Sequence, residues 1–180
     1  MRLRRQLADI LRIVAFHDPA LADSTDGDDA ALVVALKDRQ GYVYCLDAIV
    51  ERVPPSQQIE QALLLQKKYG FETLYLETNC FQGLLKTLYQ EAIIAAGVNL
   101  RVIGISQQSN KIKRVSSLEP LIANGHLLFT ESLSPRFWQQ MTLFPTGKDD
   151  GPDALQGAVE QLKRPLGQIS FHDNSTTGLF

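Results

Sequence analysis

The sequence predicts one α/β domain built on a mixed β-sheet, in which three antiparallel strands are followed by parallel strands and helices cover both faces. Three apolar, β-prone segments follow one another early in the chain, and two further such segments alternate with helix-like segments. Short connections favour antiparallel pairing, whereas a helix between two strands favours parallel pairing. The 180 residues and a hydrophobic fraction of 44% suit a single domain of ordinary size.

The first half of the chain predicts three strands and a helix. A buried strand is expected at 11–16 (LRIVAF), followed by a polar, acidic loop. Strands at 30–38 and 42–52 flank the short segment RQG, which favours a hairpin turn. A helix then begins at a double proline and ends at Gly70, since proline suits a first helical turn and glycine a helix end.

The second half predicts alternating strands and helices. The expected elements are a strand at 73–79, a helix at 81–97 ending in Gly97, a strand at 100–105, a polar and then helical segment at 107–125, a short strand at 126–129, a helix from 134, a loop at 143–153 and a last helix at 154–162. The order of all the predicted elements is that of the ribonuclease H-like fold. Residues 1–10 are interpreted as a linker remnant, 11–163 as the folded domain and 164–180 as a loose C-terminal tail.

Composition restricts the compartment and the partners. A formal net charge of -2 argues against bulk electrostatic attachment to nucleic acid or membrane, but it leaves room for a local basic groove. Cys45 and Cys80 are far apart in apolar segments and give neither metal spacing nor a disulfide framework, so we expect a reducing compartment. No apolar run approaches the length of a membrane span, and the N-terminus makes a poor signal peptide.

Carboxylates stand at the ends of predicted elements. Asp18 follows the first strand, Glu77 ends the fourth, and Asp149, Asp150 and Asp153 lie where the last helix begins. In a mixed sheet of this order the first and fourth strands are expected to be neighbours, which would bring Asp18 and Glu77 together. The last helix would pack across the same edge and add Asp150 or Asp153.

Carboxylates gathered in this way predict a divalent-cation site. They repel one another unless protons or cations intervene, and hard oxygen ligands suit Mg²⁺ or Mn²⁺. Two such ions about 4 Å apart can stabilise both oxygens of a phosphodiester displacement. The chain offers no G-x-S-x-G motif and no cysteine with an obvious base. Taken singly, Asp18 and Glu77 are also compatible with ordinary strand ends, and Asp149 and Asp150 with a favourable helix dipole.

Three segments carry a resemblance to a known family. FHDPALADSTDGDDAALVVAL, LYLETN and FPTGKDDGPDALQGAV resemble the three acidic motifs of the nuclease domain of the large terminase subunit of tailed bacteriophages, and the likeness extends over about residues 11–162. It implies a ribonuclease H-like fold and two-metal cutting of double-stranded concatemeric DNA during genome packaging in the host cytoplasm. By motif, Asp18, Glu77 and Asp150 match the catalytic, metal-binding acids. Asp153, about one helical turn further on, is an additional candidate, and which aspartate of the third motif binds metal stays open.

Basic residues near these motifs are candidates for DNA contacts. Lys111 and Arg114 match a K-x-x-R element of the family and share a helical face if the helix begins early. With Lys113 they would hold phosphates without reading sequence. Lys148 stands where some relatives have histidine, and it is expected to pair with a phosphate rather than to bind metal.

Other residues receive weaker interpretations. His17 is expected to be an exposed loop histidine, the alternative being a hydrogen-bond donor behind Asp18. Phe137 and Trp138 are expected to pack in the core rather than stack on bases. The acidic segment DSTDGDDAA is interpreted as a solvated connection, in which Asp28 or Asp29 is a candidate outer metal ligand.

One departure from the family concerns its packaging motor. A full large terminase carries an ATPase domain, and the sequence here contains no G-x-x-x-x-G-K-[ST] motif. We therefore expect an excised or free-standing nuclease domain, whose partners would be double-stranded DNA, an ATPase domain, the portal and the small terminase subunit. The alternatives are a Holliday-junction resolvase or other ribonuclease H relative, and a non-catalytic cation-binding module.

Overall fold

The structure is a computed structural model that describes residues 10–20, 29–78, 82–107, 109–131 and 133–164. Apart from Ile10, which opens the first strand, the predicted linker remnant lies outside the described residues. So do Cys80, Asp28 and all of the predicted C-terminal tail beyond Arg164.

The elements follow the predicted order. The strands are β1 (Ile10–Asp18), β2 (Ala30–Asp38), β3 (Val43–Glu51), β4 (Thr73–Glu77), β5 (Arg101–Ile105) and β6 (Leu127–Phe129). The helices are α2 (Pro55–Tyr69), α3 (Gln82–Ala96), α4 (Lys111–Ser116), α5 (Glu119–Ala123), α6 (Pro135–Leu143) and α7 (Asp150–Lys163).

All six strands form one mixed sheet in the order β5-β4-β1-β2-β3-β6. β1, β2 and β3 pair antiparallel, while β4 pairs parallel with both β1 and β5. The short β6 adds a parallel strand beside β3. The predicted antiparallel opening is therefore confirmed, and β1 and β4 are neighbours as expected.

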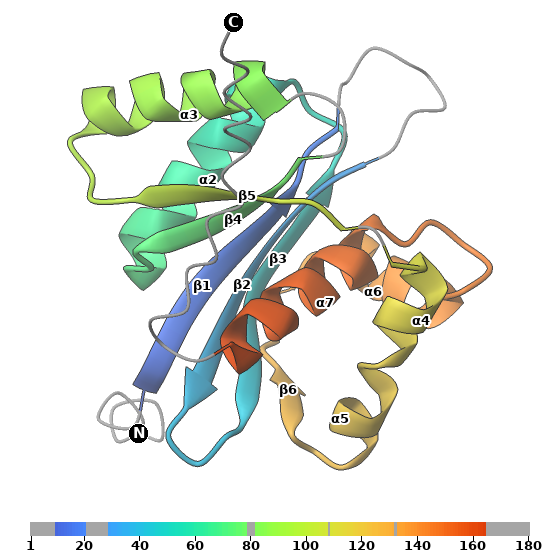
Figure 1. The fold of residues 1–180 in the computed structure, drawn as a ribbon. Helices are drawn as coiled ribbons and strands as arrows, with labels where there is room; N and C mark the ends of the chain where they lie inside the picture. The colour runs from blue at the N-terminus through green and yellow to red at the C-terminus, as the bar shows by residue number, and fades with distance from the viewer. Residues whose placement is uncertain (1–9, 21–28, 79–81, 108, 132, 165–180) are drawn as a thin grey trace, which may run out of the picture.

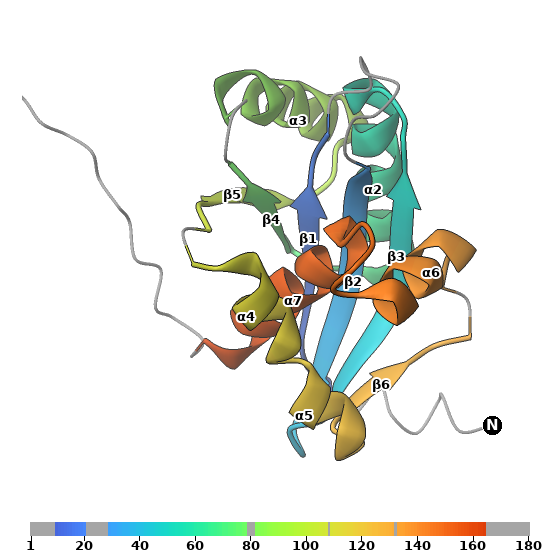
Figure 2. The same cartoon turned by 90° about the vertical axis from the view of Figure 1, so that its right-hand side faces the viewer.

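Helices cover both faces of this sheet. α2 and α3 pack on one face, and α4 to α7 lie on the other, as Figures 1 and 2 show from two sides. Strand β2 divides its side chains accordingly, because successive residues of a strand point to opposite faces. Ala31 and Val33 belong to the core that includes α7, whereas Leu32 and Val34 belong to the core under α2 and α3.

Local sequence explains the turn and the helix end beside these strands. The predicted hairpin turn between β2 and β3 contains Gly41 at φ 95°. The Asp38 carboxylate accepts hydrogen bonds from the backbone N–H groups of Gln40 and Tyr42, at 3.0 and 2.8 Å. Helix α2 ends at Gly70 in a left-handed conformation, as predicted.

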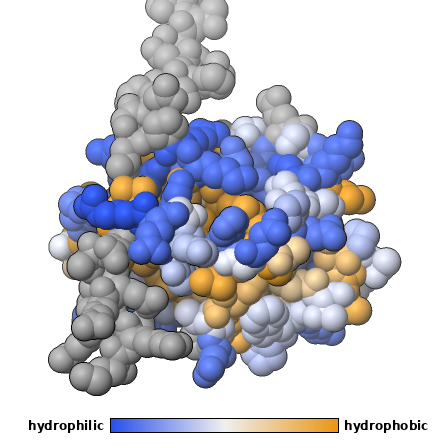
Figure 3. Space-filling view, turned by 90° about the horizontal axis from the view of Figure 1, so that it is seen from below, coloured by the Kyte–Doolittle hydropathy of each residue, from blue (hydrophilic) through white to orange (hydrophobic). Residues whose placement is uncertain are grey.

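The end of the molecule with the β2–β3 turn lies opposite the ends of β1 and β4. Seen from below, in Figure 3, it presents apolar patches among polar side chains. Ile122 on α5 and Leu128 on β6 are among the partly exposed apolar residues. No helix in the described ranges has the length and apolar character needed to cross a membrane.

Helix α7 begins one turn earlier than the sequence predicted. The loop expected over 143–153 is wrong at its end, because Asp150 already starts the helix. Pro152 falls within its first turn, where no intrahelical partner for a backbone N–H is needed. The backbone N–H of Asp153 donates to the carbonyl of Asp149 at 2.9 Å. Both Asp150 and Asp153 therefore lie on helix rather than loop.

The close packing of α7 on β1 depends on Gly157. A Cβ atom built at this position would lie 2.5 Å from Cζ of Phe16, a fully buried ring on β1. Only a glycine lets the helix backbone approach the strand so closely. Because Asp153 lies one turn before Gly157, the same contact sets the distance of Asp153 from the end of β1.

Replacing Gly157 with alanine is expected to destabilise the protein by about 1–3 kcal/mol, because the added methyl group must displace the Phe16 ring or the helix. In an ordinary exposed helix the same change stabilises by up to about 1 kcal/mol, so the predicted sign is reversed. Urea denaturation measures the difference, with the exposed α2 substitution Gln57→Ala as control. A more stable Gly157→Ala variant would contradict the packing described here.

Candidate metal centre

Two strand ends bring the first two carboxylates to one edge of the sheet. Asp18 is the last residue of β1, and Glu77 is the last residue of β4. The parallel pairing places His17 beside Leu76, so the next residues of both strands reach the same end of the sheet. Asp18 is partly exposed, while Glu77 is buried.

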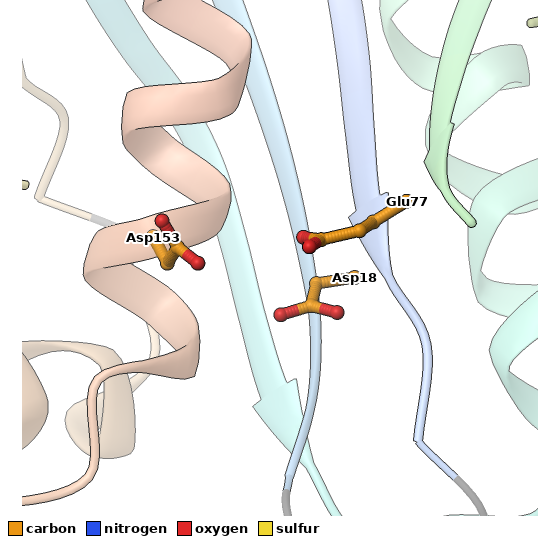
Figure 4. A group of neighbouring side chains, drawn as sticks. All are labelled: Asp18, Glu77 and Asp153. Atoms are coloured by element: carbon orange, nitrogen blue, oxygen red, sulfur yellow. The ribbon is translucent and has the colours of Figure 1, made fainter. Parts of the chain in front are cut away.

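Helix α7 adds a third carboxylate to this pair. One oxygen atom each of Asp18, Glu77 and Asp153 lies within 4.8 Å of the other two. Figure 4 shows Asp18 and Glu77 side by side, with Asp153 facing them from α7. In the part of the chain that the structure describes, no other group of three or more His, Cys, Asp or Glu side chains meets this geometry.

Asp150 lies close to this group but outside it. Its carboxylate accepts a hydrogen bond of 3.4 Å from Nε2 of Gln140, a buried side chain on α6. Of the two aspartates that the sequence left open, the structure brings Asp153 into the three-carboxylate group. Asp150 stands one turn away, with its charge near enough to affect the titration of Asp18.

The electrostatics of the group fit a cation. The pKa of Asp18 is raised well above its ordinary value, first by burial, then by the charge of Glu77, with smaller contributions from Asp150 and Asp153. Lys111 opposes this shift. Oxygen ligands on opposite sides of one Mg²⁺ stand about 4.2 Å apart, since each lies about 2.1 Å from the ion. One oxygen of each carboxylate lies within 4.8 Å of the others, and hard oxygen donors suit Mg²⁺ or Mn²⁺.

Two cations on α4 lie against the acids of α7. Nη2 of Arg114 is 2.7 Å from each carboxylate oxygen of Asp153. Nζ of Lys111 lies 2.8 Å from Asp149 and 3.6 Å from Asp153. The expectation that Lys111 and Arg114 share a helical face is confirmed, and Lys113 is exposed on the same helix. Their contacts with phosphate stay a prediction.

Lys148 and Asp29 lie together at a separate point. Nζ of Lys148 is 3.7 Å from Oδ1 of Asp29, whose side chain is fully buried. Asp29 also contacts Arg136 and Gln140 and does not join the three-carboxylate group. The sequence treated Asp29 as a possible outer metal ligand, whereas the structure surrounds it with cations.

The interpretation of His17 as an exposed loop residue is wrong. β1 continues through Asp18, so His17 lies within the strand and is fully buried on the α2/α3 side. Its Nδ1 is 2.8 Å from the Tyr89 hydroxyl, and its Nε2 is 3.1 Å from Oε1 of Gln58. Burial lowers the pKa of His17 to about 4, so its ring is neutral at pH 7.

Gln58 links this histidine to the chain that leaves the site. Its Nε2 atom donates to the carbonyls of Ala20 and Val53, at 2.7 Å each. The amide therefore holds the backbone just after Asp18 against the start of α2. Sequence reasoning missed Gln58 and Tyr89, since a glutamine and a tyrosine on amphipathic helices carry no signal of such a contact.

The two aromatic residues of α6 differ in their burial. Phe137 is fully buried, as predicted. Trp138 is 39% exposed and packs on Phe129, with ring centroids 5.1 Å apart. Core packing is thus confirmed for Phe137 and only partly for Trp138.

Comparison with solved structures shows the fold. The nuclease domain of the large terminase subunit gp2 of bacterial virus Sf6 is similar with a TM-score of 0.59 and 11% identity, over 86% of this chain and 91% of that one. A mutant form of gp2 from the same phage, with calcium, gives 0.60 and 12%, over 86% and 92%. The yeast mitochondrial Holliday junction resolvase Ydc2 gives 0.54 and 14%, over 81% and 75%. The fold is ribonuclease H-like.

Sequence comparisons add nothing to this result: no family model matches, and no curated protein matches. The resemblance to terminase nuclease domains, predicted from the three acidic motifs, agrees with the fold, and the sequence identity to the Sf6 domain is low. In this ribonuclease H-like sheet, the three carboxylates lie at the ends of the two central parallel strands and on the helix that crosses them.

Asp18→Asn is expected to raise the melting temperature in the presence of chelator, because it removes one charge from the crowded carboxylates. The sign follows from linkage: the native state holds the Asp18 proton more tightly than the unfolded chain, so the cost appears as pH rises above 3.8. The variant should also lose most of the stabilisation that Mn²⁺ gives the wild type.

Differential scanning fluorimetry with and without Mn²⁺ measures both effects, and the exposed Glu72→Gln serves as control. A variant that melts below the wild type in chelator, yet keeps the full Mn²⁺ response, would contradict the electrostatic description of the site.

Proposed function

We propose that this domain is a divalent-metal-dependent DNA endonuclease that hydrolyses phosphodiester bonds of double-stranded DNA. The observation that carries the proposal is the convergence of Asp18, Glu77 and Asp153 from three distant parts of the chain, within 4.8 Å of one another. A group of this kind is costly to maintain without a cation, as the raised pKa of Asp18 indicates.

The acidic residues of the site are assigned to metal binding. Asp18, Glu77 and Asp153 would hold Mg²⁺ or Mn²⁺, with Asp150 as an adjacent negative charge. Two such ions supply activation of water and stabilisation of the charge that develops on the phosphate oxygens. Asp18 and Glu77 are fixed by paired strands, and Asp153 by a buried helix, so the ligands are held in place before substrate arrives.

The cations of α4 balance this negative charge at its edge. Arg114 is largely covered and binds both oxygens of Asp153, which orients that carboxylate. Lys111 is more exposed and, with the exposed Lys113, is proposed to contact DNA phosphates. Lys148, which lies 3.7 Å from Asp29, is also proposed to contact a phosphate.

A protein nucleophile is not part of this proposal. Cys45 is buried in β3, and burial raises the pKa of its thiol, so it offers no thiolate. His17 faces the opposite side of the sheet and is neutral and fully hydrogen-bonded. The carboxylates would therefore hold the metal ions, and a metal-activated water would be the nucleophile.

The finer proposal is the nuclease of a phage DNA-packaging terminase, acting on concatemeric DNA in the host cytoplasm with an ATPase domain, portal and small terminase subunit. It is supported by the three acidic motifs in their order and by the similarity to the Sf6 domain over 91% of that chain. The second candidate is a Holliday-junction resolvase, which the likeness to Ydc2 favours. A resolvase works as a dimer on four-way junctions.

Plasmid digestion tests the activity. The wild type is expected to nick and linearise DNA with Mn²⁺ or Mg²⁺ and to lose activity with chelator. Substitution of a residue that supports a metal ligand typically costs 10–100-fold, so Asp18→Ala, Glu77→Ala and Asp153→Ala should each lose on the order of 100-fold or more. Asp150→Ala is expected to lose less, and the exposed Glu72→Ala to lose nothing.

Equal cutting by wild type and Asp18→Ala would end the proposal. The same assay on linear duplexes and four-way junctions separates the two candidate roles, with size-exclusion mass as a second measurement. A terminase-type nuclease should cut both linear and plasmid DNA, whereas a dimer with strong preference for junctions would favour the resolvase.

A further inference from the structure

A buried carboxylate outside the metal centre gathers three cations. Oδ1 of Asp29 lies 2.9 Å from Nη2 of Arg136, 3.7 Å from Nη2 of Arg52 and 3.7 Å from Nζ of Lys148. Its other oxygen, Oδ2, accepts a hydrogen bond of 3.1 Å from Nε2 of Gln140. We call Arg52, Arg136 and Lys148 the basic cluster. With Asp29 included, these four side chains carry a net charge of about +2 at pH 7.

The three cations reach solvent, whereas the carboxylate that they share does not. The side chains of Arg136, Lys148 and Arg52 are 45%, 40% and 27% exposed, whereas that of Asp29 is fully covered. The anion therefore serves as an internal anchor that holds three partly exposed cations close together.

The cluster is built from three separate elements. Arg52 directly follows β3, Arg136 lies in the first turn of α6, and Lys148 precedes α7. The three cations repel one another, and a bound anion would reduce this repulsion. Arginine side chains in particular offer paired N–H donors whose geometry matches phosphate.

A single side chain, Gln140, connects Asp29 to the first turn of α7. Gln140 Nε2 contacts both Asp29 and Asp150, and Gln140 Oε1 accepts a hydrogen bond of 2.7 Å from the backbone N–H of Gly151. The cluster therefore lies beside the first turn of α7. Asp153, a member of the three-carboxylate group, belongs to the same helix only one turn further.

We propose that the basic cluster binds a DNA backbone phosphate that flanks, along the strand, the phosphodiester bond being cut. This inference rests on the proposed nuclease function and names a second contact with the same substrate. Phosphates repeat along each strand at about 3.4 Å of helix rise. When one phosphate of a strand lies at the metal centre, its neighbours along the strand therefore lie beside the centre. Such a contact fixes the position of the strand without reading its sequence.

DNA binding in chelator tests the cluster without any cutting. The probe is a fluorescent 30-base-pair duplex, and the readout is anisotropy across a salt series. Arg136→Gln is expected to weaken binding about three- to tenfold at moderate salt and to reduce the slope of log K against log salt by about 1, the value for one lost phosphate contact. Arg136→Lys should recover most of the affinity, because it keeps the charge.

The matched control is Lys86→Gln, which removes one exposed lysine of α3 on the other face of the sheet. It should leave both affinity and slope unchanged. Since Arg136 also contacts the buried Asp29, a melting curve accompanies each variant. If Arg136→Gln fails to fold, Lys148→Gln provides the same test at the more distant cation.

The outcomes separate this inference from the proposed function. If folded Arg136→Gln and Lys148→Gln bind with wild-type affinity and slope, or if the wild type binds no duplex, the basic cluster is not a phosphate site. A wild type that binds through the cluster but never cuts with Mn²⁺ would refute the nuclease and leave the cluster standing. A wild type that cuts DNA, together with cluster variants that bind DNA normally, would support the nuclease and refute the phosphate site.

Discussion

The contact between Gly157 of α7 and Phe16 of β1 determines the geometry on which the rest of the molecule depends. It holds a helix that is buried along almost its whole length against the central strand, and so keeps Asp153 opposite Asp18 and Glu77. The mutual repulsion of these carboxylates acts against that arrangement, as the raised pKa of Asp18 indicates. Apolar packing of α7 on the sheet supplies the opposing free energy, so the acids stay together and are ready for a cation.

Charge is separated locally although the chain is nearly neutral overall. The carboxylates of β1, β4 and α7 form one pole, bordered by Lys111 and Arg114 on α4. The cations around Asp29 form a second pole, and Gln140 contacts both sides. A polyanion such as DNA could contact the cations through its phosphates and the carboxylates through divalent cations. The overall net charge of -2 gives no sign of this local separation of charge.

Element order alone was enough to predict that β1 and β4 are neighbours and that Asp18 and Glu77 meet, because strand ends of a parallel pair share one edge. The choice between Asp150 and Asp153 was beyond the sequence, since it depends on how α7 is rotated by its packing on Phe16. His17 was misjudged for a related reason. Its partners Gln58 and Tyr89 lie 41 and 72 positions away, on helices whose register against the sheet only the folded structure defines.

A crystal of the protein grown or soaked with Mn²⁺ and measured at the manganese absorption edge addresses the central claim most directly. The account predicts an anomalous peak bounded by carboxylate oxygens of Asp18, Glu77 and Asp153, at metal–oxygen distances of about 2.1–2.2 Å. It would be contradicted by crystals at millimolar Mn²⁺ in which these three side chains bind no ion, or in which the ion binds elsewhere.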